Sequence, residues 1–82
     1  MKQYSIKETF PPLDGEGTCG IIRQAIVIST NDPNCYRRLN LNSFGDKITA
    51  VELFEDESVG NPFIVEASKL LEELTSGDII SF

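Results

Sequence analysis

The chain has 82 residues, a formal net charge of −6, two cysteines and no histidine. A chain of this length is expected to form a single domain, residues 1–82, with a core too thin to enclose a deep pocket. The acidic excess argues against direct binding to nucleic acid or to a membrane surface, and the sequence has no apolar run near the roughly 20 residues that cross a bilayer.

The first part of the chain predicts two extended segments with a loop between them. Residues 3–9 read as a short extended segment. Residues 10–20 are expected to form a loop, because two prolines and three glycines oppose regular pairing there. The apolar, largely β-branched run 25–28 favours a buried strand within residues 21–30. That strand is expected at the centre of a sheet.

Residues 31–34 end this strand, and the segment after them is compatible with two structures. Asp32 can cap a short helix that begins at Pro33 and runs through Leu39. The alternation of leucine and asparagine at residues 39–41 is instead typical of a strand. Patterning alone leaves both structures open.

Two further strands are predicted on either side of a helical segment. Residues 42–46 read as a turn. Residues 48–55 then form a second good strand, since Val51 and Leu53 fall on one of its faces. Residues 79–82 return as a short terminal strand. The sheet is therefore expected to combine strands from both halves of the chain.

The clearest helix signal lies between these two strands. Asn61 is a natural N-cap, because its side chain can accept a hydrogen bond from a free backbone N–H, and Pro62 suits the first helical position. An apolar stripe at helical spacing follows, formed by Phe63, Ala67, Leu70, Leu71 and Leu74. Gly77 offers the left-handed residue that ends many helices. The expected fold class is therefore α+β, a small, mostly antiparallel sheet with one main helix packed on a face.

The sequence offers no set of groups from which an enzyme could be built. Without histidine, neither Cys19 nor Cys35 has a base to generate a thiolate, and a zinc site would lack its usual ligands. The glycine-rich residues 14–20 include two carboxylates and no lysine, which does not suit phosphate binding. The acidic run 55–57 lacks the ligand spacing of a calcium loop. We expect no catalytic residue, metal or cofactor, and, without a secretory signal, a cytoplasmic location with free thiols.

The first 28 residues of the chain nevertheless contain a recognisable sequence pattern. The residues that carry it are Gln3, Tyr4, Ile6, Glu8, Phe10, Leu13, Gly15, Glu16, Gly17, Gly20 and the run 25–28. This order resembles the start of the radical S-adenosylmethionine enzyme 7-carboxy-7-deazaguanine synthase. That family holds an iron–sulfur cluster on three closely spaced cysteines, whereas this chain has Cys35 alone in the corresponding region, and Asp14 stands where the family has glutamine. The resemblance implies a relative that has lost the activity, in which Glu16 corresponds to a former substrate contact.

The acidic charge is concentrated in the second half of the chain. Residues 42–82 carry nine acidic side chains against two basic ones, whereas residues 1–41 carry four acidic and five basic ones. A field of this sign favours encounter with a basic protein surface. The candidate partner-binding residues are Glu52, Glu55, Asp56, Glu57, Glu72 and Glu73.

These features predict a small acidic protein-binding module, an inhibitor or adaptor that engages a basic surface of a partner protein. One alternative is a vestigial or accessory relative of the deazaguanine enzyme. Another is a structural subunit of a larger assembly, in which residues 79–82 add a strand to a neighbouring sheet; an ordinary core strand explains these residues better. The acidity also has a simpler explanation, because acidic surfaces keep small proteins monomeric.

Overall fold

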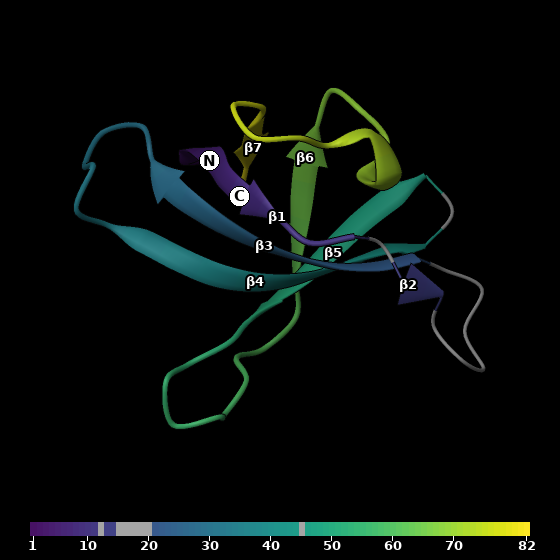
Figure 1. The fold of residues 1–82 in the computed structure, drawn as a ribbon, viewed down its shortest axis with the longest axis horizontal. Helices are drawn as coiled ribbons and strands as arrows, with labels where there is room; N and C mark the ends of the chain where they lie inside the picture. Colours follow the sequence, from purple (N-terminus) through teal and green to yellow (C-terminus); the bar gives the residue numbers. More distant parts are fainter. Residues whose placement is uncertain (12, 15–20, 45) are drawn as a thin grey trace.

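A computed structural model of the chain describes residues 1–11, 13–14, 21–44 and 46–82. The elements in chain order are β1 (Gln3–Thr9), β2 (Leu13–Asp14), β3 (Ile21–Ser29), β4 (Tyr36–Phe44), β5 (Lys47–Glu52), β6 (Phe63–Ala67), the 3₁₀ turn η1 (Leu71–Glu73) and β7 (Ile79–Ser81). All strand pairs are antiparallel, in the order β1-β7-β6-β5-β4-β3-β2. A further pairing of β1 with β3 closes six of the described strands into a barrel (Figure 1).

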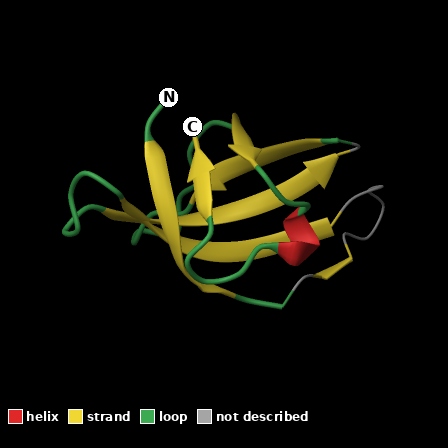
Figure 2. Cartoon of the chain, turned by 90° about the horizontal axis from the view of Figure 1, so that it is seen from above, coloured by secondary structure: helices red, strands yellow, loops and turns green. Residues whose placement is uncertain are grey.

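The barrel is an up-and-down meander that joins the two ends of the chain. Apart from the short β2, strands that follow one another in sequence are neighbours, and β7 completes the circle by pairing with β1. The termini therefore lie side by side (Figure 2). The N–H of Lys2 donates to the carbonyl of Phe82, and the N–H of Phe82 donates back to the carbonyl of Lys2, both at 3.0 Å.

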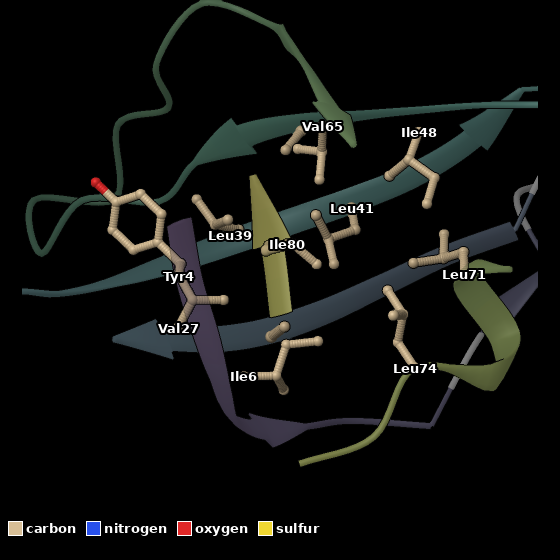
Figure 3. Packing of buried hydrophobic residues seen from close by; sticks show 12 residues of the cluster. Tyr4, Ile6, Val27, Leu39, Leu41, Ile48, Val65, Leu71, Leu74 and Ile80 are labelled. Atoms are coloured by element: carbon tan, nitrogen blue, oxygen red, sulfur yellow. The ribbon is translucent and has the colours of Figure 1, made fainter. Parts of the chain in front are cut away.

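The interior of the barrel is filled by every second residue of its strands, as the two-residue period of a strand requires. On β3, for example, Ala25 and Val27 are buried, whereas Gln24 before them is exposed and Ile26 between them is only half-buried. The buried apolar residues form one cluster (Figure 3): Tyr4, Ile6, Ala25, Val27, Leu39, Leu41, Ile48, Ala50, Val65, Leu71, Leu74 and Ile80.

An aromatic group closes one end of the barrel. The rings of Tyr4 and Phe82 are stacked with centroids 4.3 Å apart, and Phe63 packs against Phe82 at 4.8 Å. The guanidinium of Arg37 lies over this pair, 5.6 Å from the centroid of Tyr4. A cation over aromatic faces contributes about 0.5–1 kcal/mol at such a partly exposed site.

The opposite end is covered by η1. Leu71 and Leu74 are both 1% exposed and point into the barrel, Leu71 on the side of Ile48 (Figure 3). Residues three apart in a 3₁₀ turn lie on the same side, so a single short turn brings both leucines over the opening.

Arg23 holds this cover in place. Its side chain is on the inward face of β3 and is 9% exposed. The guanidinium donates to the carbonyls of Phe10 (2.8 Å), Leu71 (3.1 Å) and Glu72 (3.2 Å), and to Oγ1 of Thr9 (2.9 Å). It therefore links β3 to the end of β1 and to η1 through four acceptors that carry no formal charge.

The predicted α+β fold class is wrong, because the described residues contain no α-helix. The segment expected to form the main helix is instead β6 followed by η1. Val65 on β6 is buried, whereas Ile64 and Glu66 on either side of it are exposed, a two-residue period that suits a strand. Leu70 was expected on the apolar face of the helix and is 58% exposed.

Several other predicted elements agree with the structure. Strands occur at β1, β3, β5 and β7, close to the predicted ranges. The segment left open between helix and strand is strand β4, which extends through the predicted turn as far as Phe44. Gly77 has a φ of 97°, the left-handed conformation expected of it, but it does not end an α-helix. The described part of the chain holds no helix with the length and apolar character needed to cross a membrane.

Candidate functional site

The six acidic residues predicted to bind a partner do not form one surface. They lie in the loop between β5 and β6 (Glu55, Asp56, Glu57), at the end of β5 (Glu52) and in η1 (Glu72, Glu73). In Figure 1 the β5–β6 loop, residues 53–62, projects from the lower side of the barrel, whereas η1 lies at the upper side. The structure therefore defines two separate acidic surfaces, one before β6 and one after it.

The β5–β6 loop is an ordered hairpin turn. The N–H of Glu57 donates to the carbonyl of Phe54, and the N–H of Phe54 donates to the carbonyl of Ser58, both at 3.0 Å. Below the turn, Leu53 and Val59 form an antiparallel bridge. These bonds fix three consecutive carboxylates at the tip of a projection from the barrel.

Two apolar side chains are exposed beside these carboxylates. Phe54 is 46% exposed and Val59 is 60% exposed. In addition, Glu57 has a φ of 70°, in the left-handed region that hairpins of this length usually fill with glycine. A non-glycine residue there loses about 1 kcal/mol relative to an unstrained one. The loop thus combines a strained acidic residue with an exposed aromatic ring.

Asp56 is held in its ionised form. Its carboxylate accepts hydrogen bonds from the hydroxyl and from the backbone N–H of Ser58, the latter at 3.0 Å. These bonds favour the charged form and lower the pKa of Asp56 below the usual aspartate value. The Asp56 carboxylate therefore keeps its negative charge to a lower pH than an ordinary aspartate does.

Asp78 is stabilised in a similar way at the start of β7. The N–H of Thr75 donates to its carboxylate at 2.8 Å, and the ammonium of Lys69 lies 3.1 Å from it. The bond from Thr75, followed by that from Lys69, lowers the pKa of Asp78.

These two aspartates predict how stability changes with pH. Because the pKa of each aspartate is lower in the folded protein, the unfolded chain takes up protons first as the pH falls. The contribution of the two carboxylates to stability is therefore complete above the usual aspartate pKa of about 3.9. It is lost as the pH falls through the lower pKa of the folded state. Urea unfolding at about pH 6 and about pH 3 should show a smaller acid-induced loss for Asp56→Asn/Asp78→Asn than for the parent. Equal losses in the two proteins would contradict this assignment.

Glu52 belongs to the barrel end more than to the loop. It is half-buried, and its Oε1 lies 3.8 Å from Nη1 of Arg37. Its negative charge is therefore partly compensated within the chain. Of the residues predicted from the sequence, Glu52 is the least suited to face a partner.

The second acidic surface lines a groove of about 700 Å³. The groove is lined by residues 46–48 and 64–73, together with Ser43. It arises because β6 pairs with β5 only as far as Val65 and then pairs with β7 through Glu66 and Ala67. Figure 1 shows β6 diverging from β5 towards the side where η1 lies.

Comparisons with protein-family models, with curated proteins and with solved structures found no match for this chain. The resemblance to 7-carboxy-7-deazaguanine synthase stays a prediction, since its Gly15-Glu16-Gly17 triplet lies outside the described residues, as does Cys19. Cys35 is half-buried and forms no disulfide with a described residue. Nor do the described residues gather three or more potential ligands around a metal position.

Sequence reasoning missed the apolar components of both surfaces. Phe54 was expected within a strand, and Leu70 on the buried stripe of a helix. Ile64, 57% exposed on the outer face of β6, was not singled out at all. Its exposure follows from the alternation around Val65, a signal that the helix assignment obscured.

Proposed function

We propose that the protein is a small protein-binding module, an inhibitor or adaptor, whose β5–β6 loop engages a basic surface of a partner protein. The observation that carries the proposal is the composition of this ordered projection. It presents Glu55, Asp56 and Glu57 together with the exposed ring of Phe54 and the exposed methyl groups of Val59.

The chemistry of the loop supports both an apolar and an electrostatic contact with such a partner. Aromatic residues that fill a partner's pocket supply a large share of interface energy, and Phe54 is 46% exposed on a turn held by hydrogen bonds. Surrounding carboxylates steer a basic partner and set its orientation more than they add affinity. Because hydrogen bonds hold the turn in place, little ordering entropy would be lost on binding.

The strained position of Glu57 also favours a binding role. Glycine would adopt the left-handed conformation without strain, yet the chain has a carboxylate there. Strained backbone positions tend to occur where a side chain serves recognition.

The test is capture of partners from a lysate of the source on the immobilised protein, with elution by a salt gradient and identification by mass spectrometry. We expect one basic partner that is released by salt and is lost with Glu55→Lys/Glu57→Lys or Phe54→Ser. The first variant leaves Asp56 and its bonds to Ser58 intact.

The matched control is Glu8→Lys/Asp32→Lys, which makes the same change in charge at exposed positions away from the loop. It should retain the partner with only a small loss. Retention that hardly depends on salt, or equal loss in the loop variant and the control, would contradict the proposal.

A further inference from the structure

We propose that the groove between β5, β6 and η1 is a second docking site, which receives an extended basic segment of a partner protein with an apolar residue between lysines or arginines. This inference does not depend on the β5–β6 loop, which lies before β6 and not beside the groove. It assigns a role to Glu72 and Glu73 that differs from that of the other acidic residues.

The strand pairing makes the groove a stable feature of the fold. Ile48 pairs with Val65 at the last rung between β5 and β6, and from Glu66 onward β6 pairs with β7 instead. The two flanks of the groove therefore separate at a point fixed by the register of the barrel. On the other side, η1 is anchored by the bonds from Arg23 to the carbonyls of Leu71 and Glu72.

The groove has an apolar base. Ile48, Val65 and Leu71 belong to the buried cluster and reach its lining, while Ile64 and Leu70 are exposed to 57% and 58%. Two large aliphatic side chains left in water beside the core provide a contact for an apolar side chain. This feature distinguishes the groove from a merely solvated acidic surface.

The rim of the groove is negatively charged. Its lining contains the exposed carboxylates Asp46, Glu66, Glu72 and Glu73 against two lysines, Lys47 and Lys69. Lys69 is neutralised by Asp78, at 3.1 Å. The carboxylates come from β6, η1 and the residue before β5, so they lie on more than one flank of the groove. An occupant with positive charges on both sides of an apolar residue matches this arrangement.

The negative charge of the groove also favours some occupants over others. A second copy of the chain has a net charge of −6 and would be repelled, and nucleic acid phosphates would be repelled for the same reason. The groove is open to solvent, and its volume of about 700 Å³ leaves room for several side chains of a docked segment. A short stretch of basic polypeptide satisfies both the charge and the space.

The experiment uses a fluorescent synthetic peptide of alternating lysine and leucine, with anisotropy as the readout and amide chemical shifts to map the contact. Glu72→Lys/Glu73→Lys should weaken binding about tenfold, and Leu70→Ser about fivefold. The matched control Glu55→Lys/Glu57→Lys makes the same charge change on the β5–β6 loop and should weaken binding less than about twofold. Thermal unfolding checks that each variant is folded.

Several outcomes would overturn the proposal. Equal weakening by the two charge-reversal variants would indicate attraction to the whole molecule instead of the groove. Equally tight binding of a peptide with serine in place of leucine would remove the apolar contact. Shift changes confined to residues other than 43, 46–48 and 64–73 would place the peptide outside the groove. Self-association of the chain through Ile64 and Leu70 would assign the groove to a second copy. Because the probe is a peptide, failure here leaves the partner capture by the β5–β6 loop unaffected.

Discussion

Replacement of Arg23 by methionine is expected to lower the free energy of unfolding by about 3 kcal/mol. The guanidinium donates to the carbonyls of Phe10, Leu71 and Glu72 and to the hydroxyl of Thr9. Methionine fills similar space but donates nothing, so all four bonds are lost. Of these acceptors, the carbonyl of Leu71 keeps another donor, the N–H of Leu74 at 3.3 Å. A buried acceptor left without a donor destabilises by about 1–3 kcal/mol. Only the bond to Leu71 is fully buried, and the other three are partly buried, so water at the barrel end offsets part of their loss.

This effect should be large because the acceptors remain after the substitution. Buried ion pairs can often be replaced by apolar residues at little loss, since both partners are removed together. Here three of the four acceptors are backbone carbonyls, which no substitution removes. The stability of an 82-residue domain is roughly 4–12 kcal/mol, so the loss is a substantial fraction of the total.

Circular dichroism during thermal and urea unfolding measures the change. The midpoint should fall by about 12–24 °C for Arg23→Met. Arg23→Lys keeps the charge but not the forked set of donors, and should fall between parent and methionine variant. A methionine variant within about 1 kcal/mol of the parent would show that Arg23 does not hold the barrel end together.

Ile80→Ala is expected to destabilise the protein by about 3 kcal/mol. Ile80 is completely buried at the centre of β7, and this strand of three residues joins β1 to β6. Truncation leaves a cavity where the barrel closes, and a short strand has few other contacts to compensate.

The neighbouring residue provides the matched control. Ile79 has the same side chain in the same strand but is 42% exposed, so Ile79→Ala should change stability by less than about 1 kcal/mol. Urea unfolding of the two variants measures the difference directly. Similar losses in both would mean that strand propensity, and not burial at the closure, determines the effect. Deletion of residues 79–82 should prevent folding, as expected of an ordinary core strand.

The strands of this fold were largely predictable, because their signals are local. Apolar and β-branched residues at 25–28, and alternation at 48–51, reflect the pleat of a half-buried strand. The helix was predicted wrongly for the same reason. Asn61, Pro62 and Gly77 are sound local signals for helix ends, but they were outweighed by the need of residues 63–67 to pair between two strands. Such pairing depends on closure of the whole barrel, which no local window contains.

The candidate site was predictable in composition but not in arrangement. The count of carboxylates identified the acidic half of the chain, and Glu55, Asp56 and Glu57 do lie together because they are adjacent in sequence. Glu72 and Glu73 lie elsewhere because β6 runs between the two groups. The groove could not be foreseen at all, since it exists where β6 changes partner from β5 to β7.

The meander order also bears on how the chain reaches this structure. From β3 to β7 each strand can pair with the one just formed, so most of the barrel is accessible through short loops that close quickly. Pairing of β1 with β7 is different, because it brings together segments from opposite ends of the chain. The loop-closure entropy of this pair is therefore the largest among the strand pairs of the barrel. The barrel thus consists mainly of local hairpins, and one long-range closure joins the two ends of the chain.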